Sequence, residues 1–194
     1  MRPGWPAPNA YLFFGVFTGV EALFDRVRER IVEKYGPLHP RGESPIFPFP
    51  QTRTYSRTMG PGLQRKFFVL ANRWPQDGLA SVKQAAIEME SEIRAAGSHP
   101  VDRPVNIDPG ILNDCRIILA STKDYSHRIY RGDGIWEEVT LSYENGAYKA
   151  LPWTYPDFKN PEYHVFFEGF RQELLKLIQS ERPPPPGRVE LPPA

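Results

Sequence analysis

The sequence has only one cysteine, Cys115, so it contains no pair of thiols from which an internal disulfide could form. Proteins of reducing compartments rarely carry disulfides, and on this basis we predict a cytoplasmic protein. Cys115 lies in the apolar-leaning run Cys115–Ala120, and because buried thiols are usually inert, this argues against a nucleophile. One cysteine and four histidines form no standard zinc-binding spacing.

Neither sign of charge is in excess, because 24 lysine and arginine residues are balanced by 23 aspartate and glutamate residues. General nucleic-acid binders depend on a basic field, so this balance argues against that class and leaves only a local basic patch open.

Long apolar runs are also absent. The run Tyr11–Phe17 is far too short to span a bilayer, and it follows a proline-rich rather than a basic start, unlike a signal peptide. We therefore predict no membrane segment. A length of 194 residues with 40% hydrophobic content predicts one soluble globular domain.

Two common motifs are missing. Gly60-Pro61-Gly62 is no phosphate loop, because no Gly-Lys-Ser/Thr and helix follow it. No Gly-x-Ser-x-Gly elbow of a serine hydrolase occurs either. No single motif therefore dictates one reaction.

Proline, in contrast, is abundant, with 22 residues that divide the chain. We predict an irregular lead-in over residues 1–9, a single α+β domain over 10–180, and a proline-rich disordered tail over 181–194. Residues 37–50 are predicted to be an extended arm, because residues without an N–H cannot occupy a central strand.

The first half of the domain predicts the order β-α-β-β-α-β. Tyr11–Phe17 is a buried strand, and Thr18 with Glu21 has the spacing of a capping box before a helix that ends at Gly36. A hairpin of two strands follows, and Asp77 then starts a second helix that ends at Gly97. The remaining predicted strands are Arg53–Thr58, Arg65–Leu70 and Arg103–Asp108, the last closed by Pro109-Gly110. The apolar stripe of the second helix consists of Leu79, Val82, Ala86, Met89 and Ile93.

This order predicts a ferredoxin-like unit, with both helices on one face of an antiparallel sheet and the first and fourth strands adjacent. Further strands are predicted to extend it as a β-meander, with Asn145-Gly146 as a hairpin turn. A last helix from Asn160-Pro161 is predicted to pack back on the sheet. The predicted meander strands are Arg116–Ala120, His127–Arg131, Ile135–Tyr143 and Ala147–Leu151. The apolar face of the last helix consists of Phe166, Phe170, Leu174 and Leu177.

Several segments together closely resemble a bacterial family known as domain of unknown function 4416. The resemblance spans about residues 10–178 and implies no particular activity, ligand or catalytic residue. The segments that carry it are the early Phe-Gly strand, Met59–Leu63, the helix around Lys83, Val105–Gly110, Thr122–Tyr130, Gly134–Leu141 and Pro152–Asp157.

The string Thr122–Tyr130 mixes cations, hydroxyls and aromatic residues near a strand entrance. Lys123 and Arg128 with Ser126 would suit a phosphate or carboxylate, and His127 could act as a general acid or base. The alternative is an ordinary polar loop. The full set of predicted ligand-binding residues is Arg103, Asn106, Lys123, Ser126, Arg128, Thr140 and Tyr155.

Two carboxylates on predicted strands, Asp108 and Glu138, could transfer protons or hold a hard ion such as Mg²⁺. Against this, Asp108-Pro109-Gly110 is a good turn former, and Glu138 could pair with Arg128 across the hairpin. Lys83 and Glu90 on the second helix are interpreted as a solvated flank.

The aromatic residues Trp136, Trp153 and Tyr155 could stack a planar ligand, although core packing is the commoner role. The leading hypothesis is a protein that binds a small phosphorylated or otherwise anionic ligand, with a Mg²⁺-assisted enzyme as one form of it. The predicted catalytic residues are His127, Asp108 and Glu138. The alternatives are an RNA-binding module and an interaction scaffold that docks a partner through Phe47 and Phe49.

Overall fold

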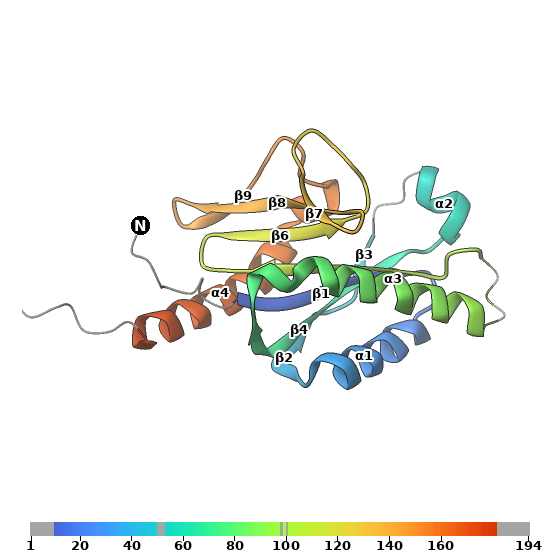
Figure 1. Cartoon of the computed structure of the whole chain (residues 1–194), viewed down its shortest axis with the longest axis horizontal. Helices are drawn as coiled ribbons and strands as arrows, with labels where there is room; N and C mark the ends of the chain where they lie inside the picture. Colours follow the sequence, from blue (N-terminus) through green and yellow to red (C-terminus); the bar gives the residue numbers. More distant parts are fainter. Residues whose placement is uncertain (1–9, 50–52, 98, 100, 182–194) are drawn as a thin grey trace, which may run out of the picture.

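The computed structural model describes residues 10–49, 53–97, 99 and 101–181. The predicted lead-in and all but the first residue of the predicted tail lie outside this range. Within it the protein is α+β, with one large antiparallel sheet and four α-helices (Figure 1). No helix among the described residues is long and apolar enough to cross a membrane.

Strand β1 (Ala10–Thr18) forms the centre of the sheet, and all nine of its residues are buried. It pairs antiparallel with β4 (Gln64–Trp74) on one side and with β5 (Val105–Leu112) on the other. A continuous apolar run suits a strand that is covered on both faces. The predicted adjacency of the first and last strands of the first half is therefore confirmed.

The complete strand order is β2-β4-β1-β5-β6-β8-β7, with β3 paired to β4 and β9 paired to β8. The predicted hairpins β7–β8 and β8–β9 are present, but β6 pairs with β8 rather than with β7, so the four strands are not the predicted meander. The strands not yet delimited are β2 (Leu38–Glu43), β3 (Phe47–Pro48), β6 (Arg116–Ser121), β7 (Ile129–Gly132), β8 (Ile135–Glu144) and β9 (Ala147–Ala150).

Helices cover both faces of the sheet. The buried residues of α1 (Ala22–Tyr35) and α3 (Leu79–Ala96) share one core with Leu12 and Phe14 of β1. α4 (Pro161–Glu181) packs against the opposite face with Tyr11 and Phe13. This alternation follows from the strand period of two, and it confirms that the first two long helices share a face.

The segment Arg53–Thr58, predicted to be a strand, is instead helix α2 (Arg53–Met59). The neighbours of β4 on that side are β2 and β3, which belong to the proline-containing arm. Proline is tolerated at a sheet edge, because its missing N–H can face outward. The arm was correctly excluded from the centre of the sheet, but it pairs at the edge rather than merely packing on the body.

Pro109-Gly110 does not close a strand as predicted, because β5 continues through it to Leu112. Gly110 is required by close packing rather than by a turn: a Cβ there would lie 2.3 Å from the Phe13 ring and 2.7 Å from the Ile118 carbonyl oxygen. A glycine in a strand often marks such a close approach.

The predicted helix caps were partly wrong. Thr18 belongs to β1, where its hydroxyl accepts from the Val20 N–H at 3.0 Å and donates to the Pro104 carbonyl at 2.6 Å. Asp77 lies in a short 3-10 helix, η1 (Gln76–Gly78), and does not cap α3. Asn160 does cap α4, since its Oδ1 accepts from the Glu162 N–H at 3.0 Å.

The buried face of α4 differs in part from the prediction, whereas the Asn145-Gly146 turn agrees with it. The buried face of α4 consists of Tyr163, Phe167, Phe170 and Leu174, so Phe166 and Leu177 lie beside it rather than on it. The Asn145-Gly146 turn has φ values of 51° and 79°, the conformation that a two-residue type I′ hairpin requires.

We expect Gly110→Ala to lower the free energy of unfolding by about 2 kcal/mol, because the added methyl group overpacks the contact between β5 and Phe13. Gly169→Ala is the matched control. Gly169 lies within α4 with only the flexible Arg41 side chain near it, at 3.3 Å, so alanine there should stabilise by up to about 1 kcal/mol. Urea unfolding measures both, and equal effects of the two changes would contradict the packing argument.

Candidate functional site

A gap opens in the sheet between β5 and β6. β5 pairs with β1 along its whole length, but with β6 only over Gly110–Leu112. In the open part, the Ile107 N–H donates to Glu90 Oε1 at 2.7 Å, and the Ile107 carbonyl accepts from Lys83 Nζ at 2.8 Å. Buried backbone groups require hydrogen-bond partners. Side chains of α3 therefore supply the hydrogen bonds that β6 does not make to Ile107.

Lys83 and Glu90 are thus not the solvated flank that the sequence suggested. Lys83 is only 4% exposed, and Glu90 is largely buried. The two residues lie seven positions apart, which places them on one side of α3, two turns from each other. Burial raises the pKa of the Glu90 carboxyl above its usual value, although Lys83 and Arg103 oppose the shift.

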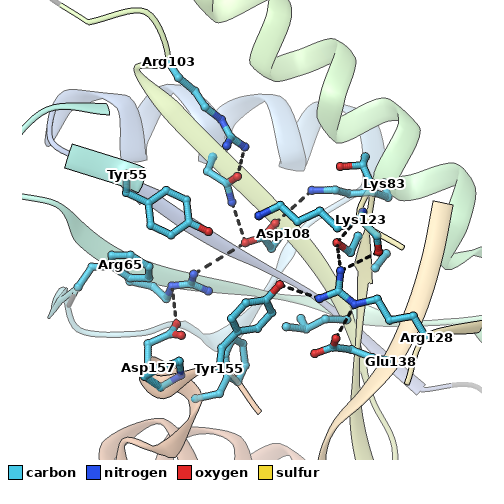
Figure 2. A pocket seen from close by; sticks show the side chains of 18 residues that line it. Tyr55, Arg65, Lys83, Arg103, Asp108, Lys123, Arg128, Glu138, Tyr155 and Asp157 are labelled. Atoms are coloured by element: carbon cyan, nitrogen blue, oxygen red, sulfur yellow. Dashed lines mark hydrogen bonds and ion pairs between the residues drawn. The ribbon is translucent and has the colours of Figure 1, made fainter. Parts of the chain in front are cut away.

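A cavity of about 270 Å³ lies beside this gap. Side chains from β4, β5, β6 and β8 and from the segment 155–158 enclose it, and several charged ends converge there from different sides (Figure 2). The lining residues are Phe49, Tyr55, Arg65, Lys83, Arg103, Asn106, Asp108, Leu119, Ala120, Ser121, Thr122, Lys123, Arg128, Glu138, Tyr155, Pro156, Asp157 and Phe158.

Asp108 is the meeting point of two cations. Its Oδ1 lies 3.1 Å from Lys83 Nζ, and its Oδ2 lies 3.8 Å from Arg65 Nη2 and accepts from Asn106 Nδ2 at 2.7 Å. Burial raises the pKa of the Asp108 carboxyl, but the charges of Lys83 and Arg65 outweigh burial, so this pKa is lowered. Asn106 also accepts a hydrogen bond from Arg103.

Arg65 is almost completely buried, at 3% exposure. Its guanidinium carbon lies 4.8 Å from the centre of the Phe17 ring and 5.0 Å from that of Phe49. Its Nε forms an ion pair with Asp157 Oδ2 at 3.3 Å, but among the described residues neither Nε nor Nη1 has a hydrogen-bond acceptor. A guanidinium has five N–H donors, so part of this capacity is unused.

Asp157 faces Arg65 from the short 3-10 helix η2 (Pro156–Lys159). Burial raises the pKa of the Asp157 carboxyl, and the charge of Arg65 offsets only part of that shift. Asp108 and Asp157 therefore differ: both lie near Arg65, but the pKa is lowered in Asp108 and raised in Asp157.

On the far wall, Arg128 is fully engaged. Its Nε donates to Glu138 Oε2 at 2.7 Å, and its Nη2 donates to the Tyr155 hydroxyl at 2.7 Å. Its Nη1 donates to Ser121 Oγ at 2.7 Å and to the Lys123 carbonyl at 2.8 Å. The pairing of Arg128 with Glu138, given above as the alternative to a metal ligand, is what the structure contains.

The cavity brings together seven of the predicted site residues: Arg103, Asn106, Asp108, Lys123, Arg128, Glu138 and Tyr155. His127 and Thr140 do not line it, but each contacts Glu138 from outside, at 3.1 and 3.2 Å. Ser126 is exposed and does not line it. Cys115 is likewise exposed rather than buried and does not line the cavity.

His127 lies in a stack of three rings. Its ring centre is 5.8 Å from that of Tyr125 and 5.0 Å from that of Trp153, with interplanar angles of 12° and 10°. Trp153 is 38% exposed, so only part of the predicted aromatic set is core. Trp136 and Tyr155 are partly buried.

Arg65, Lys83 and Asp157 are the functional candidates that the sequence reasoning missed. One signal was present for Lys83, which lies next to Val82 of the buried stripe. Arg65 is followed at alternate positions by Phe67 and Val69, which are buried on the same face. A charged residue in such a series is either paired or functional.

The donor set does not fit Mg²⁺. Asp108 is already bound by Lys83 and Arg65, and Glu138 by Arg128. No group of three or more histidine, cysteine, aspartate or glutamate side chains that could hold a metal occurs in the described part of the chain. Mg²⁺ prefers carboxylates that are free to coordinate it, so we assign it no role here.

Comparison with known families matches residues 8–174 to the family described as "Domain of unknown function (DUF4416)". The match covers most of the chain, which therefore belongs to this family, as the resemblance indicated. No curated protein and no solved structure matches the chain significantly.

We expect Asp108→Asn to lower the free energy of unfolding by about 3 kcal/mol at pH 7, because it leaves Lys83 and Arg65 without their shared carboxylate. The folded-state pKa of Asp108 lies below its ordinary value of 3.8. Its contribution is thus complete above that value and is lost as the pH falls through the folded pKa. The difference between wild type and variant should shrink below about pH 4.

Asp133→Asn is the control, because Asp133 is exposed in the turn between β7 and β8. Urea unfolding at several pH values measures both variants. A constant effect of Asp108→Asn across pH would contradict the ion-pair account.

Proposed function

We propose that this protein binds a small anionic ligand in the cavity beside the β5–β6 gap. The observation that carries the proposal is Arg65, a cation almost completely removed from water whose Nε and Nη1 lack acceptors among the described residues. Leaving donors of a buried charge unfilled is unfavourable, and an anion that reaches this guanidinium would relieve that cost.

Lys123 adds a second attraction. Its side chain is exposed at the cavity, and in the described part of the chain its ammonium forms no ion pair. The cavity volume of about 270 Å³ falls just below the range of roughly 300–1,000 Å³ typical of drug-sized ligands. Both observations favour a metabolite-sized anion, carboxylated or phosphorylated.

Catalysis is a further step of this proposal. Asp108 and Glu138 line the cavity but are held by cations, whereas His127 reaches it only through Glu138. Asp157 is the candidate proton carrier, because it lines the cavity and burial raises the pKa of its carboxyl above the ordinary value. If the protein is an enzyme, we expect Asp157 to transfer the proton.

We also propose that β1, β2, β4 and β5 with α1 and α3 form a ferredoxin-like unit. The strand order β2-β4-β1-β5 supports this, as do the antiparallel pairings and the position of both helices in one core. A cytoplasmic location remains a prediction from the single cysteine.

RNA binding is a second candidate, favoured by exposed aromatic side chains near β7. Tyr125 is 52% and Tyr130 59% exposed, and Trp153 completes the set. Exposed rings can stack unpaired bases. The scaffold alternative loses support, because Phe47 packs on Tyr163 and Phe49 on Phe17 within the chain itself.

We expect Lys123→Ala to weaken anion binding about tenfold, the effect of losing one charge-assisted contact of about 1.4 kcal/mol. Thermal-shift titrations with acetate, benzoate, inorganic phosphate and ribose 5-phosphate give the affinities. Lys149→Ala, on an exposed residue of β9 outside the cavity, should leave them unchanged. No stabilisation by any of these anions would contradict the proposal.

If the protein binds RNA, we expect nitrocellulose filters to retain mixed-sequence single-stranded RNA in its presence at low salt. Trp153→Ala should reduce this retention several-fold, because a stacking contact is lost. Lys149→Ala again serves as the control. Absence of retention by the wild-type chain would end this candidate.

A further inference from the structure

We propose that the ligand of this cavity is a monocarboxylate with a small planar, apolar body, whose carboxylate draws on the Arg65 guanidinium and the Lys123 ammonium. This inference rests on the proposed anion-binding function and narrows its ligand class. It depends on three properties of the cavity: its balance of charge, the nature of its walls, and the number of acceptors that remain free.

The charges of the cavity leave one positive charge unmatched. Five cations line it, namely Arg65, Lys83, Arg103, Lys123 and Arg128. Four carboxylates face them, three in the lining and Glu90 directly behind Arg103, at 3.2 Å. With all four ionised the surplus is a single charge, and Lys123 is the lining cation that has no ion pair with any described residue.

A single surplus charge selects for a monoanion. A carboxylate would neutralise it, whereas a phosphate dianion would carry a net negative charge into a largely enclosed site. Moving an uncompensated charge out of water is expensive. The planar guanidinium of Arg65 also matches the geometry of a carboxylate, which it can bind through two parallel hydrogen bonds.

The walls around these charges are apolar and largely aromatic. Phe49, Phe158 and Leu119 line the cavity together with the rings of Tyr55 and Tyr155. Phe49 and Phe158 also contact the Arg65 guanidinium, at 5.0 and 5.5 Å from ring centre to carbon. A ligand whose carboxylate approaches Arg65 would therefore place its body against phenyl rings, which favours a flat apolar group.

Sugars and other polyols fit this cavity less well, because among the carboxylates that line it only Asp157 keeps an oxygen, Oδ2, without a hydrogen-bond donor among the described residues, and Arg65 Nε lies 3.3 Å from that oxygen. Asp108 already accepts from Lys83 and Asn106, and Glu138 from Arg128 and Thr140. Hydroxyl groups buried without partners lose the hydrogen bonds they make in water. Sugar phosphates are therefore disfavoured both by their hydroxyl groups and by their double negative charge.

Isothermal titration calorimetry of the full chain tests the inference with five probes. Benzoate carries both the charge and the ring, acetate only the charge, and benzyl alcohol only the ring. Inorganic phosphate and ribose 5-phosphate represent the dianions. We expect benzoate to bind at least about tenfold more tightly than each of the other four, because only benzoate uses both the cations and the apolar walls.

Two variants locate the binding. Lys123→Ala should weaken benzoate about tenfold and leave benzyl alcohol unchanged, and Lys149→Ala should change neither. Benzoate affinity that is the same in Lys123→Ala as in wild type would overturn the inference, because the carboxylate would then lie elsewhere.

The remaining outcomes separate this inference from the proposed function. If phosphate or ribose 5-phosphate binds more tightly than benzoate and depends on Lys123, the anion site stands and the carboxylate class is wrong. If acetate and benzoate bind equally, the apolar walls play no part and the inference also fails. If no anion binds at all, the proposed function and this inference fail together.

Discussion

The carboxylate of Asp108 is held between two cations that reach it from opposite faces of the sheet. Lys83 comes from α3 through the gap beside β5, and Arg65 comes from β4 on the face that α4 covers. Each cation is nearly buried and relies on this carboxylate. Removal of Asp108 would leave Lys83 without a carboxylate partner among the described residues and Arg65 with Asp157 alone, so the balance of charge in the cavity depends on it.

The gap itself is a consequence of strand pairing. β5 pairs with β1 over eight residue pairs but with β6 over only three. Lys83 and Glu90 then take the place of a strand by binding both backbone groups of Ile107. A polar cavity is thereby built into the interior of a sheet without leaving this backbone unpaired. Strands carry three of the charged groups that line it, Arg65, Asp108 and Glu138, and α3 and η2 carry Lys83 and Asp157.

Patterns that depend on local chemistry were predicted correctly from the sequence. The central strand, the apolar stripe of α3, the Asn145-Gly146 turn and the Asn160 cap each follow from short-range rules. Errors arose where distant partners decide the outcome. Pro109-Gly110 has the composition of a turn, but contact with Phe13 fixes it in a strand. The arm competes with Arg53–Thr58 for the edge of β4, and no local signal reveals which one pairs.

The same division holds for the site. The polar string that follows β6 contains Lys123 and Arg128, which line the cavity, and its mixture of charged, hydroxyl and aromatic residues is visible in the sequence. Arg65 and Lys83 were not found, since their burial depends on ring contacts and a sheet gap that form only in three dimensions. A cation at a position that the apolar pattern places on a buried face of a strand or helix is therefore the sequence signal for such cavity residues.

We propose that the cavity holds a carboxylate with a flat apolar body beside Arg65. Its most direct test is a crystal structure of the protein soaked in 4-bromobenzoate, with the bromine located by its anomalous scattering. We expect one bromine peak among Phe49, Phe158 and Leu119, with the carboxylate within hydrogen-bonding distance of Arg65 or Lys123. A cavity that contains only water, with bromine elsewhere or nowhere, would contradict it.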